Sequence, residues 1–322
     1  MKLTWKLGAA VVAVAVLSTA ALAQQRAFFG IATGGTGGTY YPLGGMLAQL
    51  ISNKATVDGK KISATAEAAG ASVGNAKLLG NKEIESAFVA ADILDAAYNG
   101  SSQFAGAPLK NLRALGALYP ETVQLITRAD FNINSVRDLK GKSISSGAPG
   151  SGQYQLLTDL LKVHGMSRAD IKEDLSSFTQ AVDKIKDGNL HATLITAGVP
   201  TSSVTDFAQS HALKVVPLAG PEIAELQRQQ PYYAKVPLPA NTYKGQTVAV
   251  DTLAVMAVWA THDAVSESMA YEVTKALYEN TAILGQVHAQ GKNISLANAM
   301  AVGTTPMHPG ALRYLKEKGI AK

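Results

Sequence analysis

Short apolar runs alternate with amphipathic stretches along the chain, and this alternation limits the possible folds more than any other feature. Residues 28–33, 61–68 and 142–148 have the composition of strands, and each precedes a stretch with the apolar spacing of a helix. Strands that alternate with helices form open, largely parallel sheets covered by helices. A second block of this kind begins near residue 123, and the tail of the chain follows it. The sequence therefore predicts an α/β protein of two lobes joined by crossing segments.

The expected lobes divide the chain unequally. We predict that lobe I comprises residues 24–122 and 247–322, and that lobe II comprises residues 123–246. Pro120 is expected to separate two strands, LRALGALY and VQLITR. Residues 231–245, PYYAKVPLPANTYKG, are rich in proline and polar residues and predict an exposed connection between the lobes.

Glycine-rich turns follow strands in both blocks. They are GGTGGTYYPLGG at residues 34–45, SSGAPGSGQY at 145–154 and TAGVP at 196–200. In open α/β sheets, ligands bind at the carboxyl ends of the strands, where these turns lie. Helix N-termini carry free N–H groups that favour an anion. The turns therefore predict two lobes that face each other across a cleft and hold a small anion.

The known phosphate-binding motifs fail on spacing. A dinucleotide fingerprint that starts at Gly35 and Gly37 would need glycine where Tyr40 stands. The sequence Gly141-Lys142-Ser143 could end a Walker A loop, but Val136 occupies its first glycine position. The chain has no cysteine, and its 6 histidines lack metal-ligand spacing. We therefore predict no cofactor and no metal site.

The segment GASVG at residues 70–74 leaves an alternative open. It matches G-x-S-x-G between a strand and a helix, the context of a nucleophile elbow. Triad partners follow in the required order: Asp251, then His262, His288 or His308. An exported serine esterase that uses Ser72 is therefore an alternative function. However, only two strands precede the elbow and no HGGG-type loop does, so a tight strand-to-helix turn explains the same residues.

The N-terminus predicts export. Lys2 and Lys6 precede or adjoin an apolar run from Leu7 to Ala23, which ends in the small-residue pattern Ala21-Leu22-Ala23. This run is shorter than the ~20 residues of a spanning helix, so we expect a cleaved signal peptide of residues 1–23 and a periplasmic product. Cleavage removes two lysines, leaving 27 basic against 24 acidic residues, a net charge of +3. This small excess predicts no nucleic-acid partner.

Four segments, taken in order, resemble one family of transport proteins. They are GGTGGTYYPLGGMLAQL, LKNLRALGALYPETVQLI, VRDLKGKSISSGAPGSG and MHPGALRYLKEKG. Over essentially the whole mature chain, the sequence resembles the TAXI solute-binding proteins of TRAP (tripartite ATP-independent periplasmic) transporters. The resemblance implies a two-lobed type II periplasmic-binding-protein fold with a ligand cleft between the lobes. It also implies delivery of a solute to membrane subunits that use an ion gradient, and we expect a monomer.

The resemblance also suggests site residues. Thr36 to Tyr41 match the family's first glycine-rich loop, and Gly150 to Gly152 match its second-lobe turn. Ser72 matches a serine in a turn where Ala71 replaces the usual glycine, and Asp92 matches an acidic position after the third strand. Three positions depart from the family pattern: Ala90 where glutamine is common, Thr196 in a segment that is often more aromatic, and His191 where aspartate is common. The relatives' solutes therefore do not transfer directly to this chain.

We predict a non-enzymatic receptor that closes around a small anionic metabolite, a carboxylate such as glutamate, 2-oxoglutarate or a related dicarboxylate. The predicted ligand-binding residues are Thr36, Gly37, Gly38, Thr39, Tyr40, Ser72, Asp92, Gly150, Ser151, Gly152, Gln153 and Thr196. No residue is assigned a catalytic role. A periplasmic sensor or interaction protein that uses the same lobes is a further alternative.

Overall fold

The computed structural model describes residues 27–322, so the predicted signal peptide lies outside the described residues. The strands are β1 (Ala27–Ala32), β2 (Thr56–Val57), β3 (Lys60–Glu67), β4 (Ser86–Ala90), β5 (Leu112–Arg128), β6 (Ser143–Ser145), β7 (Lys172–Asp174), β8 (Ala192–Ala197), β9 (Leu213–Val216), β10 (Ala234–Leu238) and β11 (Val250–His262). The α-helices are α2 (Tyr40–Lys54), α3 (Ala71–Gly80), α4 (Ala91–Asn99), α5 (Gln153–Val163), α6 (Phe178–Lys186), α7 (Ser202–Ser210), α8 (Pro221–Gln229), α9 (Glu267–Tyr278), α10 (Thr281–Val287) and α11 (Pro309–Glu317). Within residues 27–322, no helix has the length and apolar character needed to cross a membrane.

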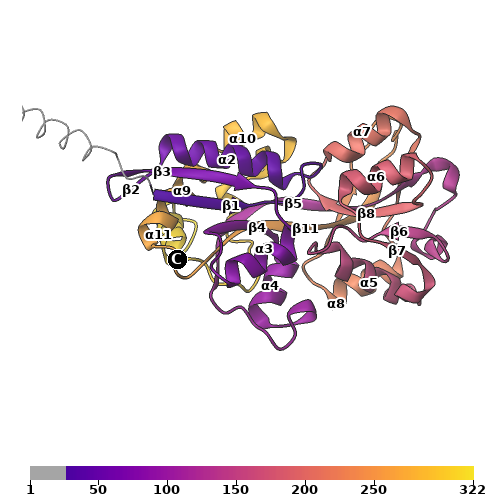
Figure 1. Cartoon of the computed structure of the whole chain (residues 1–322), viewed down its shortest axis with the longest axis horizontal. Helices are drawn as coiled ribbons and strands as arrows, with labels where there is room; N and C mark the ends of the chain where they lie inside the picture. Colours follow the sequence, from indigo (N-terminus) through magenta and orange to yellow (C-terminus); the bar gives the residue numbers. More distant parts are fainter. Residues whose placement is uncertain (1–26) are drawn as a thin grey trace, which may run out of the picture.

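Lobe I is a sheet covered by helices on both faces (Figure 1). Its strand order is β2-β3-β1-β4-β11-β5, and β1 pairs in parallel with β3 and β4. One face packs against α2, α9, α10 and α11, around a core that includes Trp259 and Phe29 in edge-to-face contact. The opposite face packs against α3 and α4. The predicted α/β class is thereby confirmed for this lobe.

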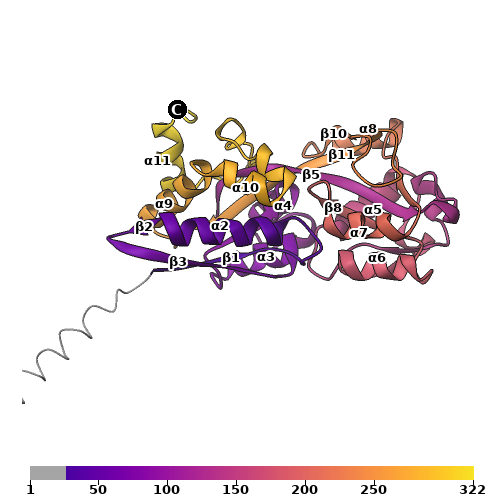
Figure 2. The ribbon, with the colours of Figure 1, turned by 90° about the horizontal axis from the view of Figure 1, so that it is seen from above.

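Lobe II has the same layered construction. Its sheet continues from β5 through β8 and β6 to β7, with β9 on β5 and β10 on β11. Helices α6 and α7 pack on one face around Phe207, and α5 and α8 pack on the other around Leu156. Figure 2 shows β5 and β11 passing from one lobe to the other.

The two long antiparallel strands join the lobes by changing partners along their length. β5 changes its partner from β11 to β8 at Thr122, and β11 changes from β10 to β5 at Ala254. Residues in the middle of these strands therefore lie at the junction of the lobes. The exact lobe boundaries given above stay a prediction.

The prediction that Pro120 separates two strands was wrong, because both runs belong to the single strand β5. Pro120 lies opposite Met256, where the register between β5 and β11 shifts before Val258. Proline cannot donate a ladder hydrogen bond, and such an irregularity is where a strand tolerates it.

The prediction of an exposed connection over residues 231–245 was wrong in part: most of these residues are exposed, but the segment is more than a connection. This segment contains β10, which pairs with the start of β11. Tyr233, Leu238 and Tyr243 are buried. The Tyr243 hydroxyl donates to Gln124 Oε1 at 2.5 Å, so the segment is part of the structure at the junction of the lobes.

Candidate functional site: a cavity between the lobes

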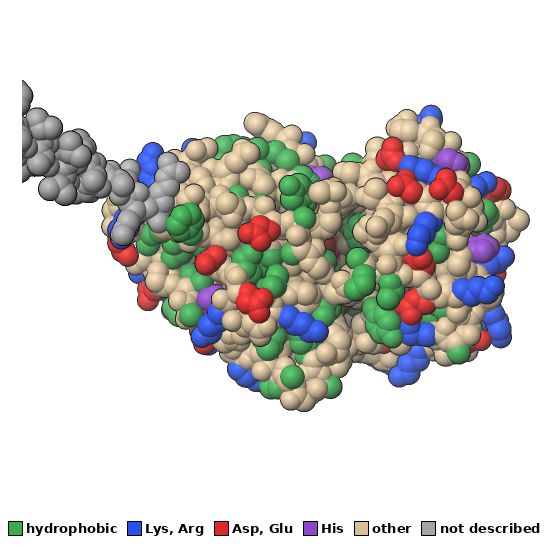
Figure 3. Space-filling view, viewed as in Figure 1, with side chains coloured by type: hydrophobic (Ala, Val, Ile, Leu, Met, Phe, Trp, Pro, Cys, Tyr) green, Lys and Arg blue, Asp and Glu red, His purple; other side chains and the backbone are tan. Residues whose placement is uncertain are grey.

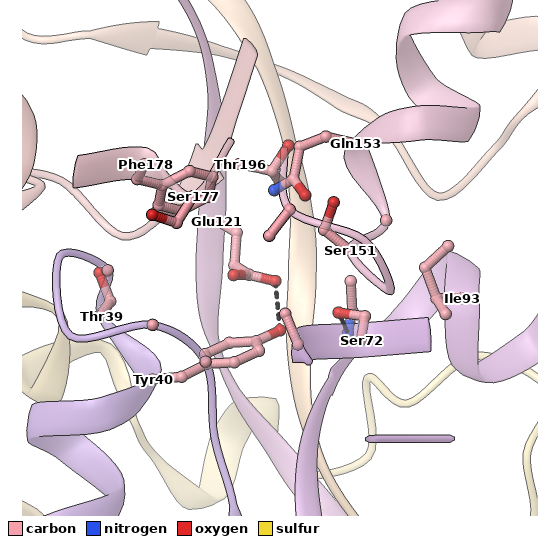
Figure 4. A pocket seen from close by; sticks show the side chains of 18 of the residues that line it. Thr39, Tyr40, Ser72, Ile93, Glu121, Ser151, Gln153, Ser177, Phe178 and Thr196 are labelled. Atoms are coloured by element: carbon pink, nitrogen blue, oxygen red, sulfur yellow. Dashed lines mark hydrogen bonds between the residues drawn. The ribbon is translucent and has the colours of Figure 1, made fainter. Parts of the chain in front are cut away.

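A cavity of about 320 Å³ lies between the two lobes, beside the crossing strands. The molecular surface is hollowed between the lobes in Figure 3, and Figure 4 shows the cavity wall. Eleven of the predicted residues line this cavity: Thr36, Gly37, Gly38, Thr39, Tyr40, Ser72, Asp92, Ser151, Gly152, Gln153 and Thr196. The structure therefore brings residues from distant parts of the sequence together, while their contact with a ligand stays a prediction.

The first glycine-rich loop joins β1 to α2 and is held in place by hydrogen bonds. Asn75 is fully buried, and its Nδ2 donates to the carbonyls of Thr33 and Phe88 at 2.9 and 2.8 Å. The Thr39 hydroxyl donates across the cleft to the Gly198 carbonyl at 3.2 Å. A Cβ at Gly37 would overlap the Thr179 hydroxyl of lobe II, so glycine permits this close approach.

Gly150 is the predicted residue that does not line the cavity. Its carbonyl accepts hydrogen bonds from the N–H groups of Val73 and Gly74 at 2.9 and 3.0 Å. These N–H groups lie near the start of α3, and the Gly150 carbonyl of the other lobe occupies them. A second backbone bond crosses the cleft, from Ser203 N–H to the Gly37 carbonyl at 3.3 Å. Gly150 therefore joins the two lobes through its carbonyl, and its contact with a ligand stays a prediction.

Ser72 is buried at the cavity wall, where its Oγ accepts a hydrogen bond from the Ala90 N–H at 3.0 Å. No histidine is among the residues that line the cavity. The triad candidate His288 is bonded to the Pro200 carbonyl and the Gln290 N–H, and His308 is bonded to the Val265 carbonyl and the Gly310 N–H.

The remaining triad candidates are also engaged elsewhere. His262 Nδ1 accepts from the Ala264 N–H, and Asp251 forms an ion pair with Lys235 at 2.9 Å. The proposed esterase triad is therefore not formed in this structure.

Replacing Ser72 by alanine is expected to lower the free energy of unfolding by about 1–3 kcal/mol, because the buried Ala90 N–H loses its acceptor. Urea unfolding measures this loss, with Ser101→Ala as an exposed control. Hydrolysis of p-nitrophenyl acetate should be the same in wild type and Ser72→Ala. A wild-type rate that disappears in the variant would restore the esterase interpretation.

Glu121 is a residue of the cavity wall that sequence reasoning missed. It lies in β5 at the junction of the lobes, is 3 % exposed, and faces the cavity (Figure 4). The Tyr40 hydroxyl donates to its Oε2 at 2.8 Å, and its Oε1 has no hydrogen-bond partner among the described residues. The pKa of Glu121 is raised to about 8, chiefly by burial, which outweighs the lowering effect of the Tyr40 hydrogen bond; the Asp92 charge makes a smaller raising contribution. An acidic residue inside an otherwise apolar strand is the sequence signal that could have identified it.

Asp92 forms the second buried carboxyl of the wall. It lies in the first turn of α4, whose N-cap is Ala90. The Tyr233 hydroxyl donates to Asp92 Oδ2 at 2.6 Å, and Oδ1 is covered without a partner among residues 27–322. Burial raises the pKa of Asp92 more than the Tyr233 hydrogen bond lowers it. Tyr233 was missed because its segment was predicted to be exposed.

Lobe II contributes the opposite wall from the starts of two helices. Ser151, Gly152 and Gln153 lie at the start of α5, as predicted. Ser177, Phe178 and Thr179 at the start of α6 were missed. Ser177 is the N-cap of a capping box with Gln180, and the S-x-x-Q spacing was the signal available in the sequence.

The charge of the lining is one-sided. Asp92 and Glu121 line the cavity, but no lysine, arginine or histidine does so. Within the part of the chain that the structure describes, no group of three or more metal-ligating side chains could hold a metal ion.

Comparison with known proteins identifies the family. The sequence profile of the NMT1-like family matches residues 31–319. The chain belongs to the NMT1-like family. This NMT1-like protein is also similar in structure to the periplasmic aliphatic sulphonate binding protein SsuA from Escherichia coli, at 17% identity and a TM-score of 0.50. That match covers 91% of this chain and 84% of SsuA.

A protein from Bordetella bronchiseptica RB50 matches the NMT1-like protein with a TM-score of 0.51, at 14% identity over 90% of this chain and 89% of that chain. Both likenesses concern the fold. Together with the two layered lobes and the crossing strands, they confirm the predicted periplasmic-binding-protein fold.

Proposed function

We propose that this NMT1-like chain is an extracytoplasmic solute receptor that closes its two lobes around a small molecule and does not transform it. The observation that carries the proposal is the cavity itself, which both lobes and the crossing strands build together. Its volume, about 320 Å³, lies at the lower end of the range for small-molecule sites. The solute is therefore a small metabolite.

The mechanism follows from contacts that exist only when the lobes meet. The bonds from Val73 and Gly74 to Gly150, and from Thr39 to Gly198, join opposite walls of the cavity. Separation of the lobes would break them and expose the cavity to water. A solute that touches both lobes has a higher affinity for the closed form, so its binding shifts the population toward that form.

The resemblance to TAXI proteins supports a TRAP transporter as the destination of the solute. Four matching segments span the mature chain, and the N-terminal pattern favours export to the periplasm. The protein would then act as a monomer that presents its closed form to the membrane subunits.

The dicarboxylate solute expected from the sequence is not retained in this proposal. The lining holds two carboxyl groups and no basic side chain that could pair with a solute carboxylate. A solute carboxylate beside Glu121 would raise the pKa of that side chain further, and it would meet no cationic side chain in the lining to pair with.

A thermal-shift experiment tests the receptor function. The chain without its signal peptide is unfolded and refolded to remove carried-over solute, and is then melted with fractions of a small-molecule cell extract. A solute at a hundredfold excess over its Kd should add about 2.7 kcal/mol to the free energy of unfolding. If no fraction raises the melting temperature, the receptor function is contradicted.

A further inference from the structure

The proposed receptor function leaves the chemical class of the solute open, and the cavity wall defines it. Resting on that function, we propose that the solute carries a positively charged nitrogen, an ammonium or amidinium group, and that the Glu121 carboxylate binds it. Glu121 would then determine the specificity of the receptor.

The geometry of Glu121 gives the first argument. Its position in β5, where the strand crosses between the lobes, directs the carboxyl group toward the centre of the cavity (Figure 4). Tyr40 occupies Oε2 and leaves Oε1 without a partner among the described residues. Oε1 is not among the covered atoms that lack a partner, so it is open to the cavity, and an ionised carboxylate oxygen can only accept a hydrogen bond. A solute that donates from nitrogen satisfies this oxygen.

The surrounding charges give the second argument. Several titratable groups interact electrostatically with Glu121 or with Asp92 beside it. They are Tyr40 from α2, Asp92 from α4, Tyr119 from β5, Tyr233 from the segment before β10 and Asp159 from α5, which acts on Asp92 and Tyr233. None of these groups is a cation. The cavity therefore holds buried acidic groups without a compensating positive charge, and such groups are stable in ionised form only when they are paired.

On binding, the positively charged solute takes the place of the proton on Glu121. Because the pKa of Glu121 is about 8, the empty cavity at neutral pH contains mainly the protonated acid. A solute ammonium that enters the cavity pairs with the ionised form, and the proton of Glu121 leaves to water. Tyr40 and Phe178 also line the cavity, and the face of an aromatic ring attracts a cation.

If Glu121 instead bound its solute in the protonated form, the affinity would depend on pH in the opposite direction. A protonated Glu121 could donate from Oε1 to an acceptor on a neutral or anionic solute. Affinity for such a solute would fall as the pH rises through the pKa of about 8. Affinity for an ammonium solute should instead rise about tenfold per pH unit up to that pKa and then level off.

The experiment compares matched probes on the refolded, solute-free chain. The probes are putrescine, 1,4-butanediol and succinate, followed by 2-phenylethylamine, 2-phenylethanol and 3-phenylpropionate. Within each series the carbon skeleton is closely matched and the end group is an amine, an alcohol or a carboxylate. We expect an amine to raise the melting temperature and its alcohol and carboxylate partners not to do so.

Variants separate a binding role of Glu121 from a structural one. In Glu121→Gln the amide still accepts from Tyr40, and the amine-induced shift and its pH dependence should both be lost. Tyr40→Phe removes the donor to Oε2, so the pH at which amine affinity levels off should move upward. Glu279→Gln removes a surface ion pair with Lys318 and should behave as the wild type does.

The inference is overturned if neither amine raises the melting temperature, if an alcohol or carboxylate probe does so equally, or if Glu121→Gln keeps the amine shift. In each of these cases, a rise in melting temperature with any fraction of the cell extract would still support the receptor function. The absence of a shift with both the probes and the extract would contradict the receptor function itself.

Discussion

The Glu121→Gln variant is expected to be more stable than the wild type above pH 8, by up to about 5 kcal/mol. The pKa of Glu121 rises from 4.5 in the unfolded chain to about 8 in the folded protein, chiefly because the side chain is buried. Between these pH values the unfolded state loses a proton that the folded state keeps, so wild-type stability falls as the pH rises. A pKa difference of about 3.5 corresponds to about 5 kcal/mol at 1.36 kcal/mol per unit. Glutamine carries no ionisable proton and avoids this loss.

The size of the effect depends on pH in a way that other causes do not reproduce. Below pH 4.5 the carboxyl group is protonated in both states, so wild type and Glu121→Gln should have similar stabilities. The difference should grow up to about pH 8 and remain constant above it. Urea unfolding across this range measures it, with Glu279→Gln as the surface control. Equal stabilities of wild type and Glu121→Gln at alkaline pH would show that Glu121 is not held in its protonated form.

The Gly37→Ala variant is expected to bind solute about tenfold to hundredfold more weakly while keeping its melting temperature without solute. A Cβ at this position would overlap the Thr179 hydroxyl and lie 3.3 Å from Ser203 Cβ, both in lobe II. Overpacking of this kind costs about 1–3 kcal/mol, which is paid only when the lobes meet.

Gly45→Ala is the control, because Gly45 lies in α2 outside the cavity lining and a Cβ there meets nothing within 4 Å. Titration calorimetry with a solute found in the thermal-shift experiment measures both affinities. Equal affinities of the two variants would contradict closure at Gly37, and a lower melting temperature of solute-free Gly37→Ala would indicate a defect within lobe I.

The sequence was sufficient to locate the two glycine-rich turns of the cavity wall. The turns after β1 and β6 are recognisable by their high glycine content. In an open α/β sheet, both lie at the carboxyl ends of strands, where ligands bind. Thr36 to Tyr40 and Ser151 to Gln153 were found in this way, and the structure places them on the cavity wall. Local pattern and a general rule of topology were enough for these residues.

Glu121 and Tyr233 were missed because their places on the cavity wall depend on long-range strand pairing. The side chain of Glu121 points into the cavity because of the register of β5 on β11, and the interruption expected at Pro120 concealed that strand. Tyr233 reaches Asp92 only because β10 pairs with β11 more than a hundred residues after α4. The role of Gly150 depends on the contact between the lobes, which no local pattern describes.

Small-angle X-ray scattering of the solute-free chain, before and after addition of a stabilising solute, tests closure most directly. We expect the solute-free protein to have a larger radius of gyration than the structure with its lobes in contact, and we expect solute to reduce it to the value of that structure. An unchanged radius of gyration with bound solute would contradict the claim that this protein closes its lobes around its ligand.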